Sequence, residues 1–266
     1  DSLPRFGTPQ SVHLVAEALR RASSDRIRFL GDPDFVQRPL ARLLSKDYAA
    51  ALRAQSDLQP ATPTPLPATS GGEPMHTTHY SIVDAQGNAA AVTTTLNGGF
   101  GSAVTVSGAG FLLNNEMDDF TSAPGKPNMF GLVQGEANAI MPGKRMLSAM
   151  TPSIVLDSTG QLYMVLGTPG GPTIITTVTQ VILNVVDQRM SLAGAVAAPR
   201  FHHQALPDII RSEGGGLNEA TIQALEAMGH KVDRRGGSGT VAAIEKTAGG
   251  YVGVIDPRSA GSALGY

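Results

Sequence analysis

A proline-rich stretch at residues 59–74 constrains the fold of this chain more than any other feature. It holds five prolines and two glycines. Proline lacks a backbone N–H and fixes φ, so the stretch predicts an extended, exposed linker. Directly after it, Tyr80 and Ile82 alternate with Ser81 and Val83. This period of two predicts a strand at 78–83, so Thr77 lies where a linker meets a sheet.

Thr77 at this position suits one kind of catalysis. If the chain is cut between His76 and Thr77, the threonine becomes the first residue of a strand. Its hydroxyl can then attack a carbonyl, with its own freed amine as the base. The plain alternative is that threonine begins this strand only because it is a good strand former.

A hairpin is expected next. Residues 84–88 read Asp-Ala-Gln-Gly-Asn, a turn in which Gly87 and Asn88 tolerate positive φ. The return strand is expected to span 89–97, which would bring Thr95 and Asn97 close to Thr77. Alternatively, its threonines reflect strand propensity alone.

Two helices are expected before the linker, at 8–30 and from Pro39 to about Gln55. Thr8 is the expected N-cap of the first helix, with Pro9 at its first position. Charged residues of the first helix are expected on a solvated, ion-paired face: Glu17, Asp25, Arg26 and Arg28. Apolar positions of the second helix are expected to be buried: Leu40, Leu43, Leu44 and Tyr48.

The rest of the chain alternates strand and helix patterns. Strands are expected at 111–113 (short and buried), 153–156, 162–166, 241–244 and 251–255. Helices are expected from Pro172, at 192–198 and at 217–229. Sheets combined with flanking helices favour stacked layers of the α+β class.

Two further stretches carry candidate chemistry. The run Asn114–Asp119 holds three carboxylates in four residues, which repel one another unless a cation neutralises them. It fits an exposed turn, a pocket for a substrate ammonium group or, less well without histidines nearby, a metal site.

The pair Gly170–Gly171 precedes a helix, where free N–H groups favour negative charge. Alternatively, the two glycines simply permit a turn. His202 and His203 are adjacent without partner ligands, so we expect structural roles.

Composition excludes several classes. The net charge of −2 gives no reason to expect nucleic acid or a membrane surface as partner. No apolar run approaches the length needed to span a bilayer. The absence of cysteine excludes disulfides and thiol chemistry. The chain does not begin with Met and shows no signal peptide, so we expect a mature fragment.

Several motifs in the same order resemble the small subunit of bacterial gamma-glutamyltranspeptidases. The resemblance runs from about residue 5 to Tyr266. The motifs that carry it are Thr77–Ser81, Asp84 with Gly87–Asn88, Thr95–Asn97, Leu113–Phe120, Pro169–Gly171 and Ala198–Gln204.

This resemblance implies the four-layer αββα fold of N-terminal nucleophile hydrolases. Residues 1–76 would be the C-terminal part of a large subunit, and 77–266 the small, catalytic subunit. Autocatalytic cleavage would occur between His76 and Thr77. The implied activity is γ-glutamyl transfer from, or hydrolysis of, glutathione and similar amides.

The resemblance also implies individual roles. Thr77 would be the nucleophile and Thr95 would orient it. Gly170 and Gly171 would form the oxyanion hole. Substrate contacts would come from the remaining matched positions: Asn97, Glu116, Asp119 and Ser148.

Two positions depart from the family pattern. Phe130 stands in the expected lid loop, 124–135, where many members carry tyrosine. Ala149 replaces the second of two adjacent serines that bind the substrate α-carboxylate. One hydrogen bond to a charged group contributes roughly 1.5–3 kcal/mol, so Ala149 predicts altered carboxylate recognition.

The family implies no cofactor and no metal. Implied partners are glutathione, a water or amino-acid acceptor and the remainder of the large subunit, in a periplasmic or extracellular location. A related glutaryl or cephalosporin acylase is one alternative function. An unprocessed, inactive fragment that acts only as an association module is another.

Overall fold

The computed structural model describes residues 3–54, 77–123 and 125–265. The proline-rich stretch, Gln55 and His76 lie outside the described residues, so the linker expected there stays a prediction. The helical elements are α1 (Pro9–Phe29), α2 (Leu40–Leu43), α3 (Lys46–Ala54), η1 (Glu116–Asp119), η2 (Glu136–Asn138), α4 (Thr173–Val186), α5 (Leu192–Ala197) and α6 (Glu219–Ala227). The strands are β1 (Thr78–Val83), β2 (Ala89–Thr94), β3 (Ser153–Leu156), β4 (Leu162–Gly167), β5 (Phe201–His202), β6 (Ile210–Glu213), β7 (Val232–Gly236), β8 (Ala242–Thr247) and β9 (Gly250–Ile255).

The hairpin that follows Thr77 forms as the alternation predicts. Strands β1 and β2 pair antiparallel, with Thr78 opposite Thr94. The Asp84 carboxylate accepts from the N–H groups of Gln86 and Asn88, and Gly87 adopts a φ of 84°. This turn fixes the register, which is what places Thr95 across from Thr77.

The hairpin packs on a four-stranded sheet of order β3-β4-β8-β9. At the contact, a Cβ built on Gly167 would lie 2.2 Å from the ring of His79, so only glycine lets the sheets approach this closely. The half-buried ring bonds to Thr93 at 2.8 Å and to Ser81 at 3.0 Å. Burial lowers the pKa of His79 to about 4, so this histidine is neutral near pH 7.

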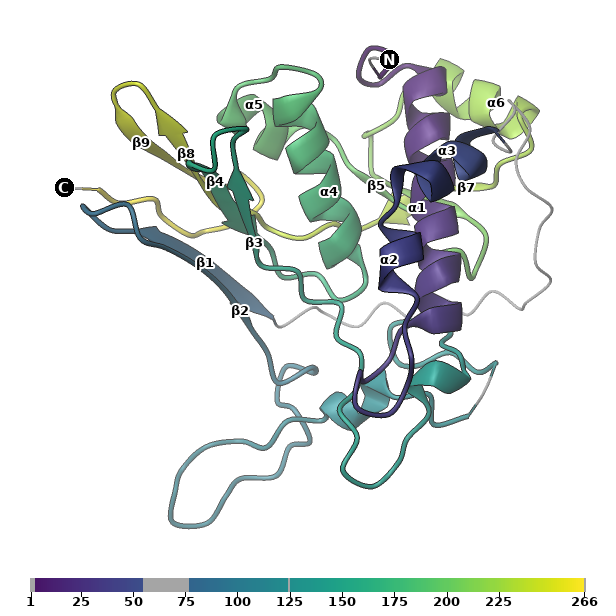
Figure 1. Ribbon diagram of the computed structural model, residues 1–266, viewed down its shortest axis with the longest axis vertical. Helices are drawn as coiled ribbons and strands as arrows, with labels where there is room; N and C mark the ends of the chain where they lie inside the picture. Colours follow the sequence, from purple (N-terminus) through teal and green to yellow (C-terminus); the bar gives the residue numbers. More distant parts are fainter. Residues whose placement is uncertain (1–2, 55–76, 124, 266) are drawn as a thin grey trace.

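Helices α4 and α5 cover the opposite face of the four-stranded sheet (Figure 1). Met164 and Leu166 of β4 are fully buried against Val178 and Val181 of α4. The described residues therefore supply three layers in sequence: helices, the four-stranded sheet and the β1–β2 hairpin. On the outward face of β1, Tyr80 and Ile82 stay 45% and 53% exposed, so no described helix covers that side.

A second core joins α1 to the sheet β5-β6-β7 and to α6. Val12, Ala16 and Leu19 of α1 pack against Phe201 and Ile210. The Thr8 hydroxyl caps α1 by accepting from the Ser11 N–H, as expected. Residues before and after the proline-rich stretch therefore share one hydrophobic core.

Three of the expected helices and strands differ in the structure. The helix expected from Pro39 divides into α2 and α3, because the Ser45 hydroxyl accepts from the Tyr48 N–H and starts a new helix. Neither piece contains a buried residue, and Leu44 is 81% exposed. The sequence missed this because their apolar spacing looks like that of a core-facing helix.

The other two errors concern strands. Strand β2 ends at Thr94, since Asn97 turns to a φ of 73°. Residues 111–113 form no named strand, only a bridge between Leu112 and Thr105, and Phe111 is 56% exposed. The short strands β5, β6 and β7 were not predicted, because runs of two to five residues carry little periodicity.

Candidate active site

The Thr77 hydroxyl donates to the Thr95 hydroxyl at 3.1 Å. Thr95 lies just beyond the end of β2, directly across the hairpin from Thr77. The Thr95 oxygen also accepts from the Asn97 N–H at 2.9 Å. Because these two contacts fix its position, Thr95 holds the Thr77 side chain in one orientation.

Asn97 lies in a left-handed backbone conformation and is 6% exposed. Its side-chain amide donates to the Asn115 carbonyl at 3.2 Å, and the Gly98 N–H donates to the Asn115 side chain at 2.8 Å. These bonds join the end of the hairpin to the acidic run Glu116–Asp119, which forms the single turn η1. The hairpin therefore positions the carboxylates relative to Thr77.

Asp119 is the carboxylate of this run that faces Thr77, since both line the same cavity. Burial, with the negative charges of Asp118 and Glu116, raises the pKa of Asp119 to about 6. Burial also raises the pKa of Glu116. Glu116 is not among the residues that line the cavity, so its expected substrate contact stays a prediction.

Gly170 and Gly171 lie at the start of α4, with φ of 147° and 52°. Their carbonyls accept from Thr173 and Ile174, while neither glycine N–H donates to another described backbone group. The ring of Phe130 lies 3.3 Å from where a Cβ on Gly171 would be. Two free donors at a helix start, under an aromatic cover, suit a developing negative charge.

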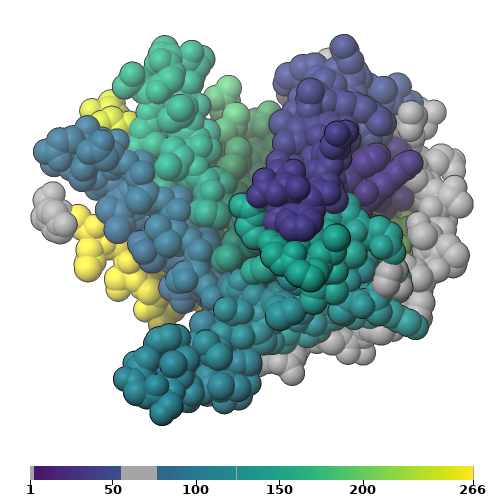
Figure 2. All heavy atoms as spheres, turned by 60° about the horizontal axis from the view of Figure 1, so that its bottom comes forward, coloured from purple at the N-terminus to yellow at the C-terminus, as the bar shows by residue number. Residues whose placement is uncertain are grey.

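Ser148 and Ala149 lie on a loop that the N-terminal segment holds in place. The buried Asp32 carboxylate accepts from the Arg145 backbone N–H at 2.7 Å and from its guanidinium at 2.6 and 3.0 Å. These bonds hold the pKa of Asp32 well below its usual range. Figure 2 shows the purple N-terminal segment lying directly on the teal part of the chain that contains this loop.

Arg26 was expected on a solvated face and instead lines the cavity. Its guanidinium donates to the Ser148 carbonyl at 3.3 Å and to the Gln134 side chain at 3.5 Å. The Gln134 amide in turn donates to the Asp119 carbonyl at 2.5 Å. Helical spacing could have placed Arg26 on the face shared with Leu19, but no local motif marked it as a site residue.

One cavity of about 30 Å³ gathers these groups. Six predicted site residues line it, and they come from five separate stretches: Thr77, Thr95, Asn97, Asp119, Ser148 and Gly171. Gly170 is adjacent in the chain but does not line it. Among the described residues, Asp119 and Arg26 are the charged side chains in its wall. Two threonine hydroxyls, a glycine at the start of α4 and both charge signs therefore meet in one place.

An apolar side chamber of about 80 Å³ adjoins this cavity. Arg26, Leu132, Ala149 and Pro172 border both spaces. The remaining wall of the chamber includes Leu19, Ile27 and Ile175. The small side chain of Ala149 thus lies between a polar cavity and a hydrophobic one.

No cluster of metal-ligating side chains occurs among the residues that the structure describes. His202 bonds to Thr176 at 2.9 Å and to Gln204 at 2.7 Å, and His203 pairs with Asp208 at 3.1 Å. Both histidines are buried, and His202 joins β5 to α4 while His203 pairs with the loop that follows β5, which fits the structural roles expected. Within 3–54, 77–123 and 125–265, no helix is long and apolar enough to cross a bilayer.

Comparison with known proteins places this geometry in context. The family model described as gamma-glutamyltranspeptidase matches residues 2–266. The chain is 48% identical over 274 residues to a glutathione hydrolase proenzyme from a Pseudomonas strain, covering 98% of this chain and 48% of the relative. It is 40% identical over 235 residues to an acylase proenzyme of another Pseudomonas strain, covering 86% of this chain and 38% of the relative.

Among solved structures, the chain resembles a gamma-glutamyltranspeptidase from Pseudomonas nitroreducens complexed with L-DON. The TM-score is 0.67 at 49% identity, over 71% of this chain and 99% of that chain. The fold is that of N-terminal nucleophile hydrolases. The chain spans about half the length of the curated relatives it matches. On these matches, the chain belongs to the gamma-glutamyltranspeptidase family.

Proposed function

We propose that the protein hydrolyses or transfers γ-glutamyl groups through Thr77, after its own backbone is cut between His76 and Thr77. The observation that carries the proposal is the cavity in which Thr77, Thr95, Asp119 and Gly171 meet. These residues are far apart in the sequence, and each was named from the motif pattern alone. Family membership supports the same chemistry.

The cut is the first step. The Thr77 hydroxyl attacks the carbonyl carbon of His76, and the peptide bond becomes an ester between that carbonyl and the Thr77 oxygen. Water then hydrolyses the ester and leaves a carboxylate on His76 and a free amine on Thr77. The new amine has a reference pKa of roughly 7.7–8.0, which suits a base near neutral pH.

The second step is acyl transfer. The Thr77 oxygen attacks the γ-carbonyl of the substrate while its amine takes the hydroxyl proton. The N–H groups of Gly170 and Gly171 stabilise the oxyanion, and the leaving amine departs with a proton. Water or an amino acid then attacks the resulting ester and releases the γ-glutamyl group.

Charge in the cavity suits a γ-glutamyl substrate. Asp119 faces the cavity and can pair with the substrate ammonium group, while Ser148 offers one hydroxyl to the carboxylate. Glutathione is the expected natural donor. The remainder of a large subunit is the expected partner chain, in a periplasmic or extracellular location.

The test is an assay of the full-length protein with γ-glutamyl anilide. We expect release of aniline, and loss of that release in Thr77→Ala. A folded protein that has been cut before Thr77 and still releases no aniline from this substrate would contradict the proposal.

A second candidate function is hydrolysis of a glutaryl or cephalosporin side-chain amide. Ala149 removes one polar contact and borders the apolar side chamber, and an acylase proenzyme is among the relatives. Glutaryl anilide, which lacks the ammonium group, separates the two functions. A higher kcat/KM for glutaryl than for γ-glutamyl anilide would favour the acylase.

A further inference from the structure

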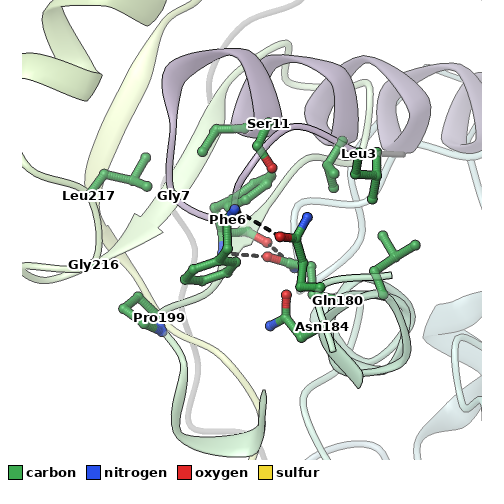
Figure 3. Close-up of a pocket in the computed structure, with 14 residues that line it drawn as sticks. Leu3, Phe6, Gly7, Ser11, Gln180, Asn184, Pro199, Gly216 and Leu217 are labelled. Carbon is green, nitrogen blue, oxygen red and sulfur yellow. Dashed lines mark hydrogen bonds between the residues drawn. The ribbon is translucent and has the colours of Figure 1, made fainter. Parts of the chain in front are cut away.

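A second hollow lies at the opposite end of the contact between α1 and α4. The first turns of α1 and the last turns of α4 form two of its walls, and β5 and the glycine-rich residues after β6 complete it (Figure 3). We call it the far hollow. The residues that define it are Leu3, Phe6, Ser11, Val12, Leu183, Asn184, Phe201 and Leu217.

The far hollow encloses about 40 Å³. Most of its wall is apolar, and none of the described residues that line it carries a charge. A charged group would therefore lose hydration there without gaining an ionic partner. The interior suits an uncharged, largely apolar molecule with room for a few atoms.

Glutamine side chains fix the shape of the walls. Gln188 accepts from the Phe6 N–H at 3.0 Å and donates to the Pro4 carbonyl at 2.9 Å. Gln180 accepts from the Phe201 N–H at 3.2 Å and donates to its carbonyl at 2.7 Å. The segment before α1 and strand β5 are thus tied to α4, and the hollow is preformed.

Two other polar side chains, Asn184 and Ser11, lie in the wall of the hollow. Asn184 is 5% exposed and Ser11 is 6% exposed, and neither side chain hydrogen-bonds to another residue drawn in Figure 3. An amide both donates and accepts hydrogen bonds, and a hydroxyl does the same, so both side chains remain available to a molecule in the hollow. Both side chains line the hollow, so a bound molecule is positioned to satisfy them.

We propose that the far hollow is a binding site for a small, neutral molecule with a short apolar body and one hydroxyl or amide group. The apolar body lies against Val12, Leu183 and Phe201. The polar group bonds to Asn184, whose amide both donates and accepts, and to the Ser11 hydroxyl. This site is separate from the cavity that contains Thr77 and does not depend on the proposed function.

The test uses butanol as probe, with ligand-detected NMR on the full-length protein. We expect saturable binding of butanol. Butyrate has the same carbon chain with a carboxylate in place of the alcohol, and we expect it to bind at least ten-fold more weakly. Equal binding of the two probes would overturn the proposal, because an uncharged hollow must discriminate between them.

Two variants assign the binding to this site. Leu183→Phe adds volume inside the hollow and is expected to abolish butanol binding. Val186→Phe adds the same kind of ring on α4 outside the hollow and is expected to leave binding unchanged. Asn184→Leu keeps the volume but removes the amide, and we expect about five-fold weaker binding, as for one lost hydrogen bond.

Stability provides an independent readout. Butanol that binds the folded protein raises its melting temperature, and we expect this rise to be smaller in Asn184→Leu than in the wild type. Thermal melts also confirm that each variant is folded. No saturable binding to wild type, or undiminished binding to folded Leu183→Phe, would show that the hollow holds water alone and would overturn the proposal.

Discussion

The two ends of the contact between α1 and α4 differ in chemistry. Near the start of α4, Arg26 and Asp119 bring both charge signs to one cavity, together with two threonine hydroxyls. Near its end, the far hollow is uncharged and its polar contribution comes from amides and a hydroxyl. The same pair of helices thus borders a polar cavity at one end and an apolar hollow at the other.

This difference shows what α1 contributes. Its apolar face forms a core with β5, β6 and α6, and its last turns carry Arg26 to the predicted site residues. Asp32, just beyond the helix, fixes the Ser148 loop through Arg145. Residues before the proline-rich stretch therefore shape a site whose proposed nucleophile follows it.

Thr77→Ala tests whether the reaction takes place in the polar cavity near the start of α4, and we expect it to have the largest effect. Without the hydroxyl, no acyl-enzyme can form, and we expect kcat to fall by about a thousand-fold or more. Thr78→Ala is the matched control, because Thr78 is the next residue in the chain and its side chain is exposed. Steady-state hydrolysis of γ-glutamyl anilide measures both, and comparable activity in Thr77→Ala would exclude it as the nucleophile.

Gly170→Ala tests the start of α4. A Cβ there would lie 2.6 Å from the Thr173 hydroxyl at a φ of 147°, so the turn must shift and carry its N–H groups away from the oxyanion. We expect kcat to fall by about a hundred-fold, as for loss of an oxyanion donor.

Gly160→Ala is the control for backbone strain. It also has positive φ but lies in the β3–β4 turn with nothing within 4 Å of its Cβ. We expect lower stability with unchanged kcat. If both glycine variants retain wild-type kcat, the role assigned to the α4 start is wrong.

Ala149→Ser tests the border between the cavity and its apolar side chamber. A restored hydroxyl can donate to a substrate carboxylate, so we expect KM for γ-glutamyl anilide to fall by about ten-fold with little change in kcat. Ser148→Ala removes a hydroxyl and should raise KM. Titration of initial rates gives both values, and an unaltered KM in Ala149→Ser would mean that this position does not face the substrate carboxylate.

The pH dependence of KM tests Asp119. Its pKa is raised to about 6, so the carboxyl becomes neutral as the pH falls through that value. A γ-glutamyl substrate loses its ammonium partner there, and we expect KM to rise up to about ten-fold per pH unit below 6. Glutaryl anilide has no ammonium group, and its KM should lack this rise; the same rise for both substrates would point to another group.

Local pattern was sufficient for the parts of the fold built from neighbouring residues. The alternation after Thr77 and the Asp84–Asn88 turn predicted the hairpin, and with it the Thr77–Thr95 contact. Helix α1, with its Thr8 cap, followed from apolar spacing. These features depend on contacts close in sequence, which periodicity and turn chemistry record.

The remaining features depend on distant partners. Arg26 looks like any solvated arginine until packing places it 3.3 Å from the Ser148 carbonyl. Leu44 has the spacing of a core residue, but no described element covers α2 and α3. The far hollow is built from scattered positions without a motif, so only the folded chain reveals it.

The central claim is that a backbone break converts Thr77 from an internal residue into a free amine with an adjacent hydroxyl. Intact mass measurement with N-terminal sequencing of the purified full-length protein tests it directly. The account predicts a fragment that begins at Thr77 in the wild type and a single uncut chain in Thr77→Ala. A wild-type protein that hydrolyses γ-glutamyl anilide while His76 and Thr77 stay joined would contradict it.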